Sequence, residues 1–250
     1  MQQSHFFSNI RTIMKRELAG YFGSPVAYVF IVIFLLLNGF FTFYISHFFE
    51  NGQADLMPFF QWHPWLFMFL VPAVAMRLWA EERRLGTIEL LLTLPVTVTE
   101  VILGKFLAAW CFIGTALLLT FPLVLTVIYL GSPDLGVIAC GYLGSFLMAG
   151  TFLSVGSMTS ALTRSQVVSF ILAVVACLFL ILAGFAPVTA MLSGWAPLWL
   201  VDLVSATSVL SHFSSIARGV VDIRDLLYYF SVMFFMIFLN GVILQNRESA

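Results

Sequence analysis

Long apolar runs separated by short polar segments dominate the chain. Six runs reach the about 20 mostly apolar residues that a helix needs to cross the hydrocarbon layer of a membrane. They lie at about residues 26–46, 62–80, 102–130, 136–162, 167–187 and 226–244. The pattern therefore predicts an all-α integral membrane protein, with a single transmembrane domain of six transmembrane helices over residues 1–250.

The segment that precedes the first span has a different pattern. In residues 6–22, apolar side chains recur at spacings of three and four, and Arg11, Lys15, Arg16 and Glu17 stand between them. This periodicity is typical of an amphipathic helix that lies in the membrane interface. We therefore predict an N-terminal interfacial helix here. A plain basic anchor is the alternative, and the two interpretations are compatible.

The largest piece outside the predicted spans is residues 188–225. Its first part is apolar, but Gly194, Pro197 and Asp202 interrupt it. Irregular backbone at membrane depth must be sheltered by protein, so we do not count this part as a span. We predict an outer apolar helical hairpin between spans five and six, formed by a pair of short helices at or dipping into the interface.

The composition supports a membrane protein and excludes a water-soluble one. Hydrophobic residues make up 61% of the 250 residues and charged residues only 9%, whereas soluble domains carry about 25% charged residues. The net charge of −1 gives no reason to expect a nucleic-acid partner. The three cysteines lie inside apolar runs without CxxC spacing, so we expect packed core residues rather than disulfides or metal ligands.

The positions of Lys and Arg predict the orientation, because cytoplasmic loops carry an excess of these residues. With six spans, both termini lie on one side of the membrane, and nine of the 11 basic residues fall on that side. We therefore predict cytoplasmic N- and C-termini. The nine residues are Arg11, Lys15, Arg16, Arg77, Arg83, Arg84, Lys105, Arg164 and Arg247.

The motifs of nucleotide and metal chemistry are missing from the sequence. Gly104-Lys105 lacks the upstream glycine and the hydroxyl residue of a P-loop, so the chain is not expected to be an enzyme or to hold a cofactor or metal. Ionisable residues are nearly absent from the spans, which argues against coupling to an ion gradient. Arg77 and Lys105 are expected to snorkel from the inner span ends.

Two alternative functions stay open on the sequence. His47 and His63 could serve a membrane haem or redox-handling protein, but only if folding brings these outer residues together. The chain could also be a structural membrane anchor for a cytoplasmic partner.

Residues 81–95 carry an unusual concentration of charge between two apolar runs. Glutamates alternate there with arginines and a short apolar run, so we predict a short helix along the membrane face, with a break at Gly86-Thr87 before Pro95 ends it. The plain alternative is a solvated positive-inside loop. Topology needs only the arginines, however, so we favour a docking face for another protein. Its contact residues are predicted to be Glu82, Arg83, Gly86, Thr87, Glu89 and Leu92.

This segment resembles the cytoplasmic coupling segment of ABC-2 type transporter permeases. The resemblance rests on the pattern Glu82-x-x-x-Gly86-Thr87-x-Glu89-x-Leu91-Leu92-x-x-Pro95 and on the order of elements along nearly the whole chain. The outer stretch from His212 to Asp222 is similar to the short permeases of gliding-motility and copper-enzyme-maturation systems.

The resemblance implies a permease subunit in a bacterial inner membrane. A dimer of separate ABC ATPase subunits would bind ATP and Mg, and closure of the ATPase on the segment from Glu82 to Leu92 would drive export or mechanical transmission. The interfacial helix would complete that contact. The other implied partners are the lipid bilayer, a second permease subunit, and a periplasmic accessory protein. The second permease would form either a homodimer or a heterodimer with a related longer chain.

Overall fold

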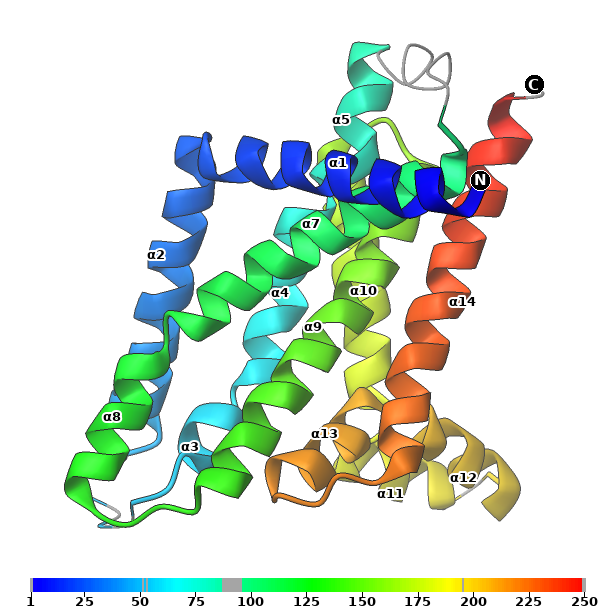
Figure 1. Ribbon diagram of the computed structural model, residues 1–250. Helices are drawn as coiled ribbons and strands as arrows, with labels where there is room; N and C mark the ends of the chain where they lie inside the picture. Colours follow the sequence, from blue (N-terminus) through cyan, green and yellow to red (C-terminus); the bar gives the residue numbers. More distant parts are fainter. Residues whose placement is uncertain (1, 51, 53, 87–95, 195, 249–250) are drawn as a thin grey trace.

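Figure 1 shows the computed structural model of the chain, which describes residues 2–50, 52, 54–86, 96–194 and 196–248. Every regular element among these residues is a helix, which confirms the predicted all-α class. In chain order the helices are α1 (Gln2–Phe22), α2 (Pro25–Gly39), the π-helix η1 (Phe40–Ile45), α3 (Met57–Phe60), α4 (His63–Ala75), α5 (Arg77–Leu85), α7 (Val98–Leu118), α8 (Phe121–Leu130), α9 (Leu135–Leu162), α10 (Gln166–Leu182), α11 (Ala186–Ser193), α12 (Leu198–Ala206), α13 (Val209–Ala217) and α14 (Ile223–Glu248).

Five helical stretches among the described residues are long and apolar enough to cross a membrane. They are Pro25–Ile45, His63–Leu85, Val98–Leu130, Leu135–Leu162 and Ile223–Asn246. The number rises to as many as seven if two bent pairs, α10 with α11 and α12 with α13, each count as one span. The chain is therefore a multi-pass membrane protein. The start of α1 and the end of α14 lie at the same end of the bundle (Figure 1), which we call the α1 end; the opposite end is the α13 end.

Helix α9 occupies the centre of the bundle and packs against α4, α5, α7, α10, α13 and α14. Small residues in α9 make these approaches possible. A Cβ atom added at Gly156 would overlap Ala75 of α4, and one added at Gly141 would overlap Phe60. Close backbone approach without large side chains is typical of helix packing in membranes.

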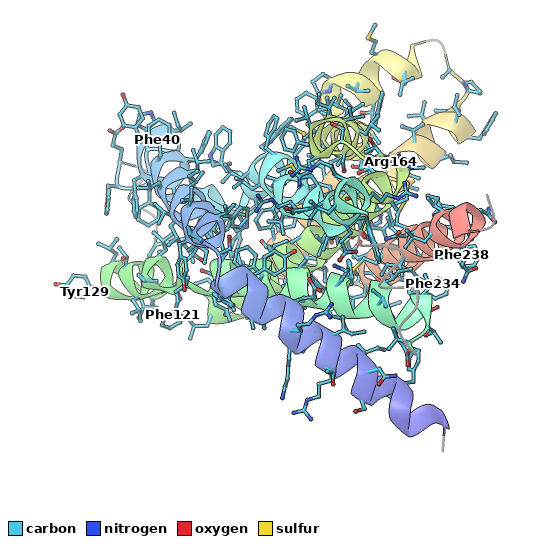
Figure 2. All side chains as sticks on the ribbon, turned by 90° about the horizontal axis from the view of Figure 1, so that it is seen from above. Phe40, Phe121, Tyr129, Arg164, Phe234 and Phe238 are labelled. Atoms are coloured by element: carbon cyan, nitrogen blue, oxygen red, sulfur yellow. The ribbon has the colours of Figure 1, made fainter. Side chains whose placement is uncertain are left out.

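Large apolar side chains cover the outside of the bundle. Figure 2 shows Phe40, Phe121, Tyr129, Phe234 and Phe238 pointing away from the helices that carry them. Each of them is exposed, with Tyr129 at 91%. Since lipid tails are as apolar as these side chains, an exterior of this kind suits a hydrocarbon solvent rather than water.

Two helices extend further toward the α1 end than the predicted spans. The third span, expected to begin near residue 102, begins at Val98, because Thr97 and Glu100 form a capping box. The second span, expected to end near residue 80, continues through α5 to Leu85. Glu82 and Arg83 therefore belong to the extension of this span, and the prediction that they begin a separate helix along the membrane face is wrong.

Among its described residues, the region between α10 and α14 holds three short helices, α11, α12 and α13, where the sequence predicted a pair. Helix α10 bends by 67° into α11, and α12 bends by 61° into α13. Neither α11 nor α12 has a buried residue, whereas α13 buries Val209, Phe213 and Ile216. Only the third helix is thus packed firmly into the bundle, against α9 and α14.

Candidate functional site

The amphipathic helix α1 lies across the α1 end of the bundle and packs along α7 (Figure 1). Its apolar side faces α7, with Ile10 buried and the ring of Tyr21 stacked on Phe112 at 5.0 Å. Gly104 lies at the crossing, where an added Cβ would be 2.6 Å from Cγ2 of Ile13. The absence of a side chain at Gly104 therefore lets the two helices approach closely.

A polar contact fixes the start of α7 to α1. The Glu100 carboxylate accepts hydrogen bonds from the backbone N–H of Thr97 at 2.7 Å and from the Asn9 side chain at 3.1 Å. One glutamate thus completes the capping box of α7 and also holds α1. Interactions of this kind with a charged acceptor are about twice as strong as those between neutral groups.

Three charged side chains from α1, α5 and α7 meet behind this contact. Lys105 Nζ lies 2.7 Å from Glu82 Oε1 and 3.5 Å from Glu17 Oε1. It also lies 5.6 Å from the centroid of the Trp79 ring. The Lys105 side chain is only 5% exposed, so the prediction that it snorkels to the interface is wrong. We call Glu17, Glu82 and Lys105 the charged junction.

The charges around the junction are nearly balanced. Arg16 Nη2 lies 3.0 Å from Glu17 Oε1, the same oxygen that faces Lys105. Two carboxylates therefore face two cations, of which Lys105 is 5% exposed and Arg16 is 59% exposed. On the buried side, around Lys105, an unpaired charge would be costly. Burial, and to a lesser extent the neighbouring Glu17 carboxylate, raise the pKa of Tyr21, so its hydroxyl stays neutral next to these charges.

The base of α5 is fixed to α9 by a serine. The second membrane-spanning stretch is interrupted at Met76, between α4 and α5. The side chain of Ser160, on α9, hydrogen-bonds to backbone groups at this interruption. Its hydroxyl donates to the Met76 carbonyl at 2.9 Å and accepts from the N–H groups of Trp79 and Ala80 at 3.1 and 3.0 Å. One side chain thus satisfies three backbone groups that a break leaves without helical partners.

The indole of Trp79 extends this attachment to a second helix. Its Nε1–H donates to Ser157 Oγ at 3.1 Å, and Asn240 of α14 donates to the same oxygen at 2.7 Å. Helix α5 is therefore anchored at its base to α9 and α14, and along its side to Lys105.

Beyond the junction, α5 projects past α1 and away from the bundle (Figure 1). It ends at Gly86, whose φ of +71° ends the helix in the left-handed conformation that glycine adopts readily. Arg83 and Arg84 stand in the last turn, where cations complement the helix dipole.

The structure brings together some predicted site residues and leaves others apart. Glu82 and Arg83 lie on α5, and Gly86 ends it; Thr87, Glu89 and Leu92 lie outside the described residues. On α1, Arg11, Lys15 and Arg16 are exposed, whereas Glu17 turns inward to Lys105. Two predicted groups, the interfacial helix and the charged segment, thus meet through a lysine that neither prediction contained.

Sequence reasoning missed Lys105, Ser160 and Gly104 as site residues. The T-x-x-E pattern of the capping box at Thr97 was a readable signal, because it places Lys105 within the first turns of α7. The serine and the glycine carried no signal beyond their small size. The arrangement as a whole connects the base of the projecting helix α5 to α1, α7 and α9.

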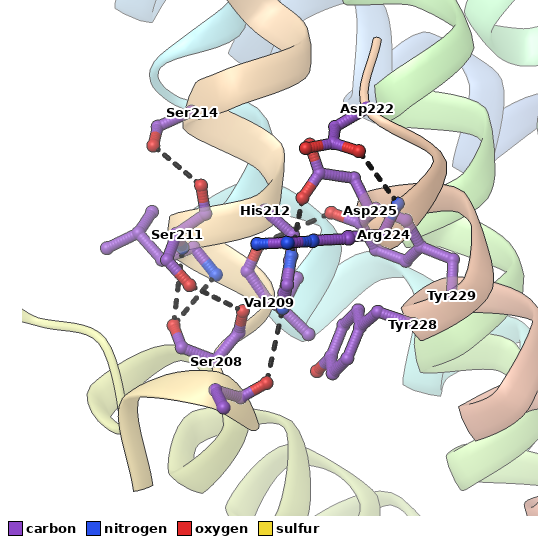
Figure 3. A network of polar contacts seen from close by, with 12 residues as sticks. Ser208, Val209, Ser211, His212, Ser214, Asp222, Arg224, Asp225, Tyr228 and Tyr229 are labelled. Atoms are coloured by element: carbon purple, nitrogen blue, oxygen red, sulfur yellow. Dashed lines mark hydrogen bonds and ion pairs between the residues drawn. The ribbon is translucent and has the colours of Figure 1, made fainter. Parts of the chain in front are cut away.

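A second polar cluster lies at the α13 end (Figure 3). His212 Nδ1 lies 2.6 Å from Asp225 Oδ1, and His212 Nε2 lies 3.2 Å from the Ala206 carbonyl oxygen. The imidazole stacks on Tyr228 at 4.1 Å, and the Tyr228 hydroxyl donates to the Thr207 carbonyl at 2.6 Å. We call His212, Asp225 and Tyr228 the outer network; it joins the α12–α13 bend to the start of α14.

His47 and His63, the candidate ligands of the haem alternative, each contact protein side chains in the structure. His63 is fully buried, with its Nδ1 2.7 Å from Ser145 Oγ and its ring stacked on Phe67 at 5.1 Å. His47 Nδ1 lies 3.2 Å from Glu50 Oε2. A haem iron could reach His63 only if the aromatic packing around that ring were displaced, so the geometry gives the haem alternative no support.

Comparison with known proteins gives one family match. The family model described as ABC-2 family transporter protein matches residues 11–245, nearly the whole chain. No curated protein matches the sequence.

Proposed function

The chain belongs to the ABC-2 transporter family, and from that premise we propose that it couples ATP hydrolysis on a separate ATPase subunit to export or mechanical transmission across a bacterial inner membrane. ABC-2 members are the membrane component of ABC transporters, so an ABC ATPase partner follows from the family. ATP and Mg would be bound by that partner.

The observation that carries the proposal is the charged junction at the side of a projecting helix. The end of α5, from Glu82 to Gly86, and the segment that follows it up to Leu92 form the docking face in this proposal. A partner that displaces this end acts on Lys105 directly, because Lys105 Nζ is 2.7 Å from Glu82. The same lysine faces Glu17, so the displacement reaches the interfacial helix α1 and, through the backbone of Lys105, the long helix α7.

The remaining parts of the proposal concern topology and assembly. The spans would be α2 with η1, α4 with α5, α7 with α8, α9, α10 and α14, with both termini in the cytoplasm. Two such chains, or one with a related longer permease, would pair above an ATPase dimer, and a periplasmic accessory protein would bind at the α13 end. The nine-to-two distribution of basic residues supports this orientation.

The test is to co-purify the chain with its ATPase and measure ATP hydrolysis with and without the chain. Leu85→Asp and Glu89→Lys should each abolish co-purification. The first places a carboxylate at an apolar position of the docking face, and the second reverses a charge there. Leu85 is 62% exposed, so the substitution has little effect on the fold itself. Arg164→Glu, an exposed charge reversal in the connection between α9 and α10, is the matched control and should leave binding intact.

Full binding and activity of Leu85→Asp and Glu89→Lys would contradict the docking proposal. So would equal loss in the Arg164→Glu control, because that result would make the interaction a general charge effect.

A further inference from the structure

A cavity of about 530 Å³ lies beside the charged junction, between the elbow of α1 and α2 on one side and α4 and α5 on the other. Its volume is within the about 300–1,000 Å³ of typical ligand sites. Its wall toward the middle of the bundle is apolar and includes Val29, Ile33, Leu70, Ala73 and Val74. Its rim at the α1 end carries Glu17, Arg77, Glu81, Glu82 and Lys105.

The charged side chains of the rim differ in exposure and in the distances of their ion pairs. Lys105 is 5% exposed and sits close to Glu82 and Glu17. Arg77 and Glu81 are instead 40% and 38% exposed, and Arg77 Nε lies 3.9 Å from Glu81 Oε2 without a hydrogen bond. A loose exposed pair of this kind contributes little to stability and costs little to open. The rim thus presents an accessible cation and an accessible carboxylate one helical turn apart.

The cavity is accessible from the side that faces lipid. Val29 and Ile33 of α2 line it and are 56% and 43% exposed, so the cavity is open along this helix. The rim lies at the level of α1, the helix that the amphipathic pattern assigns to the membrane interface. An amphiphile could therefore enter between α2 and α4 with its polar end at the rim.

We propose that this cavity binds one zwitterionic aminophospholipid from the leaflet at the α1 end. The lipid phosphate contacts Arg77, its ammonium group contacts Glu81, and one acyl chain follows Ile33, Leu70 and Val74. Glu17 and Glu82 already face Lys105 and Arg16, which leaves Arg77 and Glu81 as the accessible rim charges. An anionic lipid would pair with Arg77 alone and leave the Glu81 carboxylate uncompensated, whereas a zwitterion pairs with both. The inference needs the chain to lie in a membrane but does not depend on an ATPase partner.

The experiment is native mass spectrometry of the purified chain after reconstitution in liposomes of phosphatidylethanolamine, phosphatidylglycerol and phosphatidylcholine. We expect one retained phosphatidylethanolamine per chain, in about tenfold preference over phosphatidylglycerol. Arg77→Gln should lower retention about tenfold, the loss that corresponds to one charge-assisted hydrogen bond. Arg164→Gln, which removes an exposed arginine away from the cavity, should change nothing.

A second pair of variants tests the apolar wall and does not touch the rim. Ile33→Trp should block the chain path and lower retention, whereas Val32→Trp, an exposed position on the same helix outside the cavity lining, should not. Retention of phosphatidylglycerol equal to that of phosphatidylethanolamine would overturn the proposal. It would also be overturned if Ile33→Cys cross-links to a second copy of the chain while no lipid is retained, because the cavity would then be a subunit interface.

Discussion

The charged junction and the outer network are both built around partly buried polar side chains in close contact, but they join different kinds of elements. The junction brings together Glu17, Glu82 and Lys105, which are far apart in the sequence. The outer network lies within residues 206–228 and joins the α12–α13 bend to the helix that follows. The first arrangement links three helices that are distant from one another in the sequence, whereas the second joins neighbouring elements of the chain.

The side chains of the two clusters also differ in how their neighbours restrain them. In the outer network, the His212 ring has a partner at each nitrogen and stacks on Tyr228, so shape and hydrogen bonding restrain it together. In the junction, flexible Lys and Glu side chains meet mainly through charge, and the aromatic neighbour is Trp79, whose ring centroid lies 5.6 Å from Lys105 Nζ. The proposed coupling would use the flexibility of these side chains, because they could stay in contact while the end of α5 is displaced.

The largest effect should come from Lys105→Met. The substitution leaves the Glu82 and Glu17 carboxylates without their shared partner, and removing one member of a buried pair costs about 3–5 kcal/mol. We expect a large drop in the thermal unfolding temperature in detergent. The double variant Lys105→Met/Glu82→Gln should recover most of the stability but none of the ATPase-coupled activity. A Lys105→Met protein as stable and as active as the wild type would show that the junction is not a coupling element.

A smaller effect is expected where α1 crosses α7. Gly104→Ala should destabilise the protein by about 1–3 kcal/mol, because the new methyl group overlaps Ile13 and pushes the helices apart. Gly20→Ala in α1 is the matched control, since an added Cβ there meets no atom within 4 Å. Chemical denaturation of both variants in the same detergent measures the difference. Equal stabilities would mean that α1 is not packed on α7 in the membrane.

The smallest effect should come from the outer network. Asp225→Asn keeps the shape of the side chain and a hydrogen bond to His212, so the expected loss is about 1 kcal/mol of stability. Coupling to the ATPase should be unchanged. Asp222→Asn, which alters an exposed cap of the Arg224 N–H, should stay within about 0.5 kcal/mol. If Asp225→Asn instead abolishes coupled activity while the protein stays folded, the contrast between the two regions fails.

Much of the fold could be predicted from the sequence because lipid imposes a simple rule on it. Long apolar runs predicted the membrane helices, and the three-and-four spacing before them predicted α1. The boundaries were less accurate: a local capping box starts α7 earlier than its hydrophobicity indicates, and α5 carries the second span beyond the end of its apolar run. The backbone groups at the Met76 interruption are satisfied by Ser160, which lies far away in the sequence.

The sequence predicted the interfacial helix and the docking segment separately, without the contact that joins them. Charge placed Glu17 in the interfacial helix and Glu82 in the following docking segment, but their meeting depends on Lys105, which sits in a mostly apolar run. A lysine in such a run is expected to extend to water, and only the fold shows that two carboxylates face it instead. Pairings between distant charges require the packing of the helices, which local sequence patterns do not specify.

The most direct test of coupling through the junction is a distance measurement between spin labels in the complex with the ATPase. Labels at Glu81 on α5, which is 38% exposed and lies outside the proposed docking face, at Lys15 on α1, and at Arg164 as a reference report the α5–α1 and α1–reference distances with and without trapped ATP, on a background without the three cysteines. We expect α5 and α1 to move together relative to the reference in the wild type, and α5 to move alone in Lys105→Met/Glu82→Gln. Equal movement of α1 in both proteins would contradict transmission through the charged junction.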